Sequence, residues 1–147
     1  MKILGHDYPD DCFYLLERDM WCRAQADGTL RVGVTAFGVS ISGDFFMCRP
    51  KPAGTVLEQG QTLGVAELNK SVVTLKTPAS GTVAAVNPLL ADRPEIIQQD
   101  CYGQGWLIDL LPSRWQDDLA RLAHGPALPA AAQARMRLEN QTFPASP

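Results

Sequence analysis

The sequence predicts a mainly β domain with short helices and a further helix near its C-terminal end. Between residues 12 and 111, runs of four to six residues rich in Val, Leu, Phe and Thr alternate with Gly, Pro, Asn and Asp, which is typical of short strands joined by turns. After Pro112 the apolar residues recur at helical spacing instead. The length of 147 residues is enough for one domain with a hydrophobic core and short for two.

Three regions are expected along the chain: a polar N-terminal arm over residues 1–12, a strand-rich domain with a docked helix over 13–125, and an Ala- and Pro-rich tail over 126–147. Asp27 and Gly28 predict a tight hairpin turn between the second and third strands. The expected strands are Phe13–Leu16, Trp21–Gln25, Leu30–Thr35, Asp44–Cys48, Thr55–Leu57, Thr62–Leu68, Ser71–Lys76, Gly81–Val86 and Trp106–Leu110.

Two short helices interrupt the predicted strands. Ala36–Ser42 meets Gly43, a residue type that commonly ends helices. Arg93–Gln99 has Pro94 in its first turn, where a missing N–H is tolerated. Residues 49–54 are predicted to form a loop, because their two prolines cannot continue a central strand.

The segment after residue 112 is expected to form a helix that docks on the β core. Ser113 and Gln116 have the spacing of a capping box, in which each side chain bonds to the other residue's backbone N–H. An apolar stripe follows, formed by Trp115, Leu119 and Leu122. Gly125 is expected to end this helix. A second helix is expected over Pro129–Gln141, and a frayed end over Thr142–Pro147.

The composition argues against several classes of partner. Thirteen Lys+Arg against 16 Asp+Glu give a formal net charge of −3 with no basic block, so no nucleic-acid partner is expected. No apolar run approaches the roughly 20 residues that span a bilayer, and the first residues lack the apolar core of a secretory signal. A cytoplasmic protein without a membrane partner is therefore expected.

The cysteines and histidines match neither a metal site nor a catalytic site. The cysteines are Cys12, Cys22, Cys48 and Cys101. Their spacing fits no zinc or iron–sulfur motif, so they are expected to be small buried hydrophobes. The alternative is that Cys22 or Cys101 meets a redox or sulfur-carrying group. With only His6 and His124 present, no catalytic triad is expected. The pattern favours a carrier or binding protein over an enzyme.

One predicted hairpin presents a lysine at its tip. Two extended runs, Thr62–Leu68 and Ser71–Lys76, are separated only by Asn69 and Lys70. A connection of this length selects a type I′ or II′ turn, with Asn69 suited to the first central position. The expected cross-strand pairs are Leu68–Ser71, Ala66–Val73 and Gly64–Leu75. Ala66, Val73 and Leu75 would then face the core, and Lys70 would point into solvent.

A lysine on a stiff two-stranded arm is what an amide-linked, swinging prosthetic group requires. The ε-amine must be accessible to an enzyme, and the base of the arm must stay fixed. Glu67 precedes Lys70 by three residues, and the sharp turn Pro78-Ala-Ser-Gly81 follows the hairpin. Without a modification, the same lysine would be a solubilising turn residue.

Five segments between Trp21 and Trp106 fall in the order and at the spacings of a known family. They are Val32-Gly-Val-Thr35, Gly43-Asp44, Glu67-Leu-Asn-Lys70, Pro78-Ala-Ser-Gly81 and Tyr102-Gly-Gln-Gly-Trp106. In this combination the chain resembles the lipoyl-carrying H protein of the glycine cleavage system. The resemblance implies a flattened lipoyl-domain-type barrel of two sandwiched antiparallel sheets (a barrel-sandwich hybrid). It also implies lipoate linked as an amide to Lys70. Glu67 would either help a lipoate ligase or lipoyl-assembly enzyme recognise the hairpin or be only a solvated strand residue, and both interpretations stay open.

Departures from that family indicate a divergent branch. Asp19 stands where glycine-cleavage H proteins usually carry His, Cys48-Arg-Pro-Lys-Pro52 replaces an acidic strand end, and Ser71–Lys76 replaces an Ala-rich run. These features resemble the lipoate-binding proteins of the heterodisulfide-reductase-like sulfur oxidation system. The preferred expectation is therefore a carrier of sulfur-bound intermediates, with the heterodisulfide-reductase-like complex as partner. Asp19 and Trp21 are candidates to line the surface on which the arm rests, although structural packing is the preferred role for Trp21.

Three alternatives stay open. The first is an H protein of the glycine cleavage system, which carries the aminomethyl group between the glycine-cleavage enzymes and is reoxidised by dihydrolipoamide dehydrogenase. The second is an unmodified structural or regulatory module. The third is a biotin carrier, which is disfavoured because such carriers usually present Met-Lys-Met at the tip, whereas this chain has Asn69-Lys70-Ser71.

Overall fold

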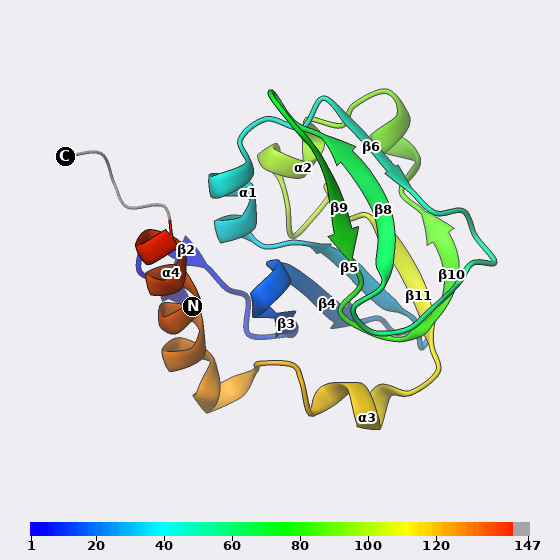
Figure 1. Ribbon diagram of the computed structural model, residues 1–147. Helices are drawn as coiled ribbons and strands as arrows, with labels where there is room; N and C mark the ends of the chain where they lie inside the picture. The colour runs from blue at the N-terminus through cyan, green and yellow to red at the C-terminus, as the bar shows by residue number, and fades with distance from the viewer. Residues whose placement is uncertain (143–147) are drawn as a thin grey trace.

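The protein is mainly β, with two antiparallel sheets packed against each other, as the sequence predicts (Figure 1). The computed structural model describes residues 1–142. The strands are β1 Lys2–Ile3, β2 His6–Asp7, β3 Cys12–Leu15, β4 Met20–Ala24, β5 Leu30–Val34, β6 Met47–Pro50, β7 Val56–Leu57, β8 Thr62–Glu67, β9 Val72–Lys76, β10 Gly81–Val86 and β11 Ile108–Pro112. The larger sheet has the order β3-β4-β5-β11-β10-β7, the smaller has the order β6-β8-β9, and β1 pairs with β2.

Short helices connect the strands, and a longer one lies at the C-terminal end. The α-helices are α1 Ala36–Ser42, α2 Ile96–Gln99, α3 Trp115–Leu119 and α4 Leu128–Thr142, and the 3-10 helices are η1 Leu16–Arg18, η2 Pro88–Ala91 and η3 Gly125–Ala127. The prediction for α1 is confirmed at both ends. The Thr35 side chain accepts a hydrogen bond from the Gly38 N–H at 3.0 Å, and Gly43 ends the helix at a φ of 77°.

The main hydrophobic core lies between the two larger sheets. Alternate residues of each strand point inward, so Val32 and Leu110 of the larger sheet meet Cys48, Ala66 and Leu75 of the smaller one. This packing of two inner faces produces the flattened, two-layered shape, and it fixes the base of the hairpin formed by β8 and β9.

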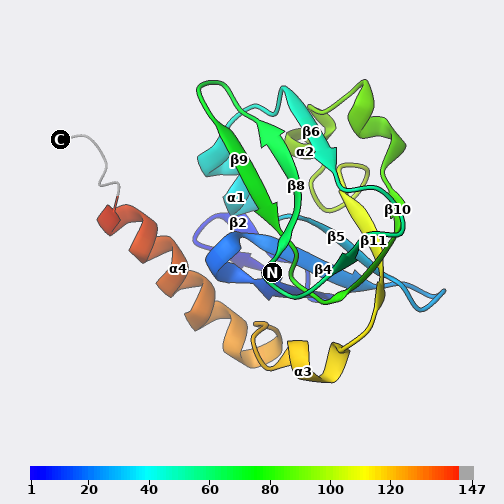
Figure 2. The same ribbon diagram turned by 45° about the vertical axis from the view of Figure 1, so that its right-hand side comes forward.

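A second buried cluster lies on the other face of β3 and β4. Its residues come from the N-terminal hairpin, from the larger sheet and from two helices: Ile3, Tyr8, Cys12, Tyr14, Trp21, Phe37, Leu128, Ala132 and Met136. Figure 2 shows α4 lying along this side of the molecule. The expected polar arm and the expected tail thus both contribute to a buried cluster. The helix predicted over 129–141 is confirmed as α4, and residues 143–147 of the predicted frayed end lie outside the described residues.

The prediction of a loop at residues 49–54 is wrong at its start. β6 runs through Arg49 to Pro50, and Pro50 pairs with Gly64 of β8. A proline is tolerated here because β6 is an edge strand, where a missing N–H need not break a ladder bond. The backbones come so close that a Cβ on Gly64 would lie 2.6 Å from the Pro50 Cα.

The predicted capping box is also wrong. Ser113 makes no capping bond, and α3 is only five residues long. Its buried Asp118 instead accepts a hydrogen bond from the backbone N–H of Ser80 at 2.6 Å. After α3 the chain returns to the sheet, where Ala123 and Tyr14 form an isolated β-bridge. Contacts distant in sequence therefore decide how this segment folds.

Candidate functional site

The hairpin of β8 and β9 has the predicted register. Gly64 pairs with Leu75 and Ala66 with Val73. The Leu68 N–H donates to the Ser71 carbonyl at 2.8 Å. Asn69 and Lys70 are therefore the two connecting residues, as predicted.

The predicted turn type is wrong. Leu4 and Asp19 are the only non-glycine residues with positive φ in the described part of the chain, so Asn69 does not adopt the conformation that type I′ or II′ requires. Turns with negative φ match the strand twist less well, and the ladder accordingly ends at Glu67 and Val72.

The inner face of the hairpin is anchored in the core. Ala66 is fully buried, Leu75 is buried, and Val73 packs against the same cluster from a half-buried position. Because the side chains of a strand alternate between its two faces, this anchoring fixes the orientation of the whole hairpin. The tip therefore extends from a rigid base.

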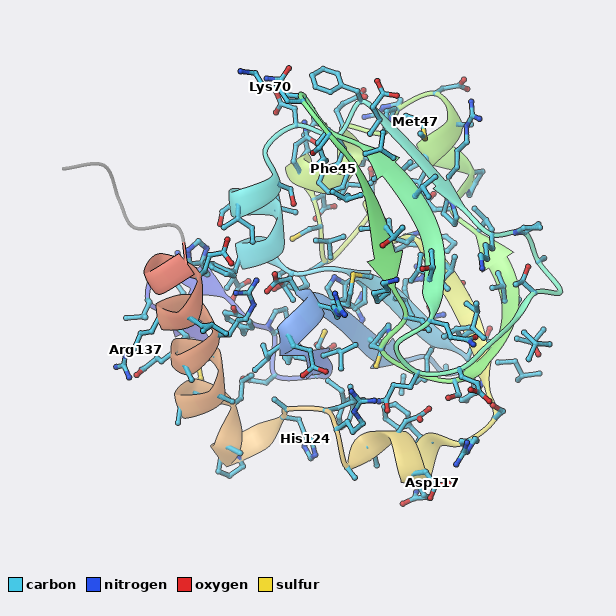
Figure 3. The ribbon with its side chains drawn as sticks, viewed as in Figure 1. Phe45, Met47, Lys70, Asp117, His124 and Arg137 are labelled. Atoms are coloured by element: carbon cyan, nitrogen blue, oxygen red, sulfur yellow. The ribbon has the colours of Figure 1, made fainter. Side chains whose placement is uncertain are left out.

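Lys70 is exposed at the free end of this hairpin. Figure 3 shows its side chain projecting away from the two sheets. Among residues 1–142, no hydrogen bond, ion pair or ring contact is formed by its amine. An amine in this position is open to acylation by an enzyme.

Glu67 lies on the outer face of the hairpin, and its side chain is exposed. It stands opposite Val72 on one side and Met47 on the other. Its backbone carbonyl accepts a hydrogen bond from Phe46 at 2.9 Å. The carboxylate is therefore presented to solvent on the same arm as Lys70.

A groove along β6 was not predicted from the sequence. It has a volume of about 710 Å³ and lies between β6 and the segment that includes η2. Its lining includes Phe46, Met47, Cys48, Pro88 and Leu90. No local pattern predicts it, because it depends on how η2 packs against an edge strand.

The cysteines occupy the positions expected of small hydrophobes. Cys12, Cys22 and Cys48 are buried and Cys101 is half-buried, all with free thiols. Burial raises the pKa of Cys12 and Cys48 to about 12 and that of Cys101 to about 11, and it raises the pKa of Cys22 as well. Their thiols are thus protonated at neutral pH, which makes them poor nucleophiles.

The preferred packing role of Trp21 is confirmed, and neither Asp19 nor Trp21 lines a surface on which the arm could rest. Trp21 is fully buried, and its Nε1 donates to the carbonyls of Val34 and Cys101, both at 3.1 Å. It therefore has the packing role. Asp19 is also buried, and its Oδ2 accepts from Arg135 of α4 at 2.7 Å. Burial raises the pKa of Asp19, although the nearby guanidinium acts in the opposite direction.

The described residues contain neither a metal-binding cluster nor a membrane-spanning helix. No group of three or more His, Cys, Asp and Glu side chains in residues 1–142 is placed to hold a metal ion. Within the same part of the chain, no helix has the length and apolar character needed to cross a membrane.

Comparisons with known proteins agree with one another. Residues 13–133 match the family described as Glycine cleavage H-protein. A glycine cleavage system H protein of Mycobacterium avium (strain 104) is 41% identical over 104 residues, covering 71% of this chain and 78% of that protein. One from Mycobacterium leprae (strain Br4923) is 40% identical over 104 residues, with the same coverage. The crystal structure of a glycine cleavage system H protein from Mycobacterium marinum superposes with a TM-score of 0.69 at 31% identity, covering 88% of this chain and 98% of that one.

These relatives favour one of the two carrier interpretations. Each is described as a glycine cleavage system H protein. None of these matches supports the sulfur-oxidation branch that the departures in sequence suggested. The findings therefore favour the glycine-cleavage alternative.

Proposed function

The chain belongs to the glycine cleavage H-protein family, and from this premise we propose that it is the lipoyl carrier of a glycine cleavage system, with the lipoyl group attached to Lys70. Proteins of this family are carriers and not themselves enzymes, and they hold lipoate on a lysine. The proposed cargo is the aminomethyl group. The proposed compartment is the cytoplasm, where four free cysteines are expected to stay reduced.

The observation that carries the proposal is the placement of Lys70. Its amine is exposed and unpaired within the described residues, and it lies at the end of a hairpin whose Ala66 and Leu75 are fixed in the core. An attached group therefore has a fixed pivot and a free end. This is the arrangement that a carrier needs to reach more than one partner enzyme.

The residues of the hairpin fit the group chemically. An ε-amine forms an amide with the lipoate carboxyl group, and no neighbouring side chain among the described residues competes for this amine. When bound, the lipoyl group would supply a five-membered disulfide that can take up a reducing fragment on one sulfur while the other sulfur becomes a thiol. The protein itself supplies attachment, reach and docking.

Several partners follow from the proposal. A lipoate ligase or a lipoyl-assembly enzyme would form the amide, and we propose that the exposed Glu67 carboxylate contributes to recognition of the hairpin by this enzyme. The glycine-cleavage enzymes would load and unload the carrier, and dihydrolipoamide dehydrogenase would restore its disulfide.

Complementation tests the proposed pathway. The chain is expressed with lipoate in a bacterial strain that lacks its own glycine-cleavage H protein, and glycine-dependent growth is measured. Rescue by the wild-type chain and loss of rescue in Lys70→Arg, at equal protein levels, are expected. If the wild-type chain becomes lipoylated but does not rescue growth, it serves a different lipoate-dependent system, and the glycine-cleavage assignment is wrong.

A further inference from the structure

The free edge of β9 leads directly away from the Lys70 turn. β9 pairs only with β8 and is the outermost strand of the smaller sheet, as Figure 2 shows. Because Leu68 bonds to Ser71, the bonded pairs alternate down the ladder as 68–71, 66–73 and 64–75. The backbone N–H and C=O groups of Val72 and Thr74 consequently point away from β8. Within residues 1–142, these groups have no hydrogen-bond partner.

The other edges of the two larger sheets are protected. β3 is covered by the bridge between Tyr14 and Ala123, and β7 has only two residues. β6 ends in Pro50. Prolines, short lengths and covering segments are the usual means by which proteins prevent unwanted strand pairing.

The edge of β9 has no such protection next to the turn. Residues 71–75 read Ser-Val-Val-Thr-Leu, with no proline and no charge. Val72 is 66% exposed, and Thr74 is exposed as well. This stretch has a high preference for strand pairing, and it presents unpaired donors and acceptors beside the residue proposed for modification.

We propose that the β9 edge is a docking site for an extended strand of the enzyme that acylates Lys70. The inference rests on the proposed function, and it adds how the acylating enzyme is positioned. A strand bonded to Val72 and Thr74 continues the three-stranded sheet and passes close to Lys70, because Val72 is only two residues further along the chain. Main-chain bonds supply the affinity in strand addition of this kind, and their register would fix the lysine relative to the enzyme.

A second copy of this chain is the less suitable occupant. The symmetric antiparallel pairing that uses the outward groups of both Val72 and Thr74 is centred on Val73. It would place Lys70 of one copy opposite Lys76 of the other, and like charges in that position oppose pairing. An enzyme strand without basic residues at its ends avoids this repulsion.

Proline substitutions test the proposal. Val72→Pro and Thr74→Pro each remove an outward N–H without removing a bond to β8, and an edge strand tolerates this change. Val72→Thr and Thr74→Val are the matched controls, because they keep the N–H. The measurement is kcat/KM for attachment of lipoate by a lipoate ligase with ATP, followed by intact mass. In each proline variant kcat/KM is expected to fall about ten-fold or more, because a hydrogen bond is lost and the proline ring adds bulk. In the controls kcat/KM is expected to stay within about two-fold of the wild-type value.

Hydrogen exchange provides a second readout that does not depend on the variants folding. In wild-type protein mixed with the ligase and lipoate but without ATP, the amides of Val72 and Thr74 are expected to become protected, whereas the Val73 amide, already bonded to β8, changes little. Unchanged exchange at Val72 and Thr74, or wild-type rates in both folded proline variants, overturns the docking proposal while the carrier function stands.

Two further outcomes would also count against the proposal, and they differ from each other. A wild-type dimer in solution that is lost in Val72→Pro would assign the edge to a second copy. Failure of the wild-type chain to be lipoylated at Lys70 would instead refute the carrier function, together with the docking that depends on it.

Discussion

Replacing Arg135 with Ala tests how α4 is held against the rest of the protein. The guanidinium donates to Asp19 at 2.7 Å, to Glu139 at 3.0 Å and to the carbonyl of Leu16 at 3.1 Å. The side chains of Arg135 and Asp19 are only 14% and 10% exposed. The second carboxylate oxygen of Asp19 has no hydrogen-bond partner among the described residues, so Arg135 is its principal stabilising contact. Removing one partner of a buried ion pair costs about 3–5 kcal/mol, and a loss of about 3 kcal/mol in the free energy of unfolding is expected.

The loss should depend on pH in a defined direction. Burial raises the pKa of Asp19 in the folded state above its ordinary value, so the folded state binds more protons than the unfolded state in the window between these two values. The contribution of Asp19 to stability is therefore greatest below that window and falls as the pH rises through it. Without Arg135 the pKa of Asp19 in the folded state rises further, so the loss of stability with rising pH becomes larger. The difference between wild type and Arg135→Ala should increase from about pH 4 to pH 7.

Urea unfolding followed by circular dichroism measures both quantities. Arg121→Ala is the matched control, because the Arg121–Glu17 pair is 61% and 59% exposed and is expected to contribute less than about 1 kcal/mol. Adding Asp19→Asn to Arg135→Ala should recover part of the loss at pH 7. Equal effects of the Arg135 and Arg121 substitutions at pH 7, or a difference that does not change with pH, would refute the reasoning.

Four further substitutions test the site and its support. Gly64→Ala should destabilise the protein by about 1–3 kcal/mol, since its Cβ would lie 2.6 Å from the Pro50 Cα; a wild-type melting temperature would contradict the close approach. Trp21→Phe should cost about 1–3 kcal/mol in denaturant unfolding, because the buried carbonyl of Val34 and the partly buried carbonyl of Cys101 lose their indole donor. Cys101→Ser should change stability by about 0.5 kcal/mol or less and rescue growth like wild type, and loss of rescue in a folded variant would show that the thiol has a role in the chemistry. Glu67→Gln should lower kcat/KM for lipoylation without changing unfolding, and an unchanged rate would remove its proposed role in recognition.

The hairpin register was predictable because its determinants are local. Two strand-like runs separated by two residues leave one arrangement in which Ala66, Val73 and Leu75 share a face, and the structure has that arrangement. The turn conformation did not follow from Asn69, since its preference for positive φ is a tendency and not a requirement. The sequence could therefore place Lys70 at the tip without giving the shape of the tip.

The second buried cluster could not be predicted, because its contacts join the two ends of the chain. Ile3 and Met136 belong to this cluster from opposite ends of the chain, and the separate ion pair between Asp19 and Arg135 joins residues 116 apart in sequence. The same limit explains the failed capping box, where Asp118 bonds to Ser80 of a distant turn instead of supporting a cap at Ser113. A local pattern of this strength adds only about 1 kcal/mol, and a buried hydrogen bond to a charged group outweighs it.

Mapping the modified residue tests the central claim most directly. The protein is produced with lipoate and its ligase, and its intact mass is measured before peptide mapping. The expected result is the mass of one lipoyl group, located on Lys70, absent in Lys70→Arg and retained in Lys51→Arg, which alters another exposed lysine. An unmodified mass, or a lipoyl group mapped to any other lysine, would contradict the account.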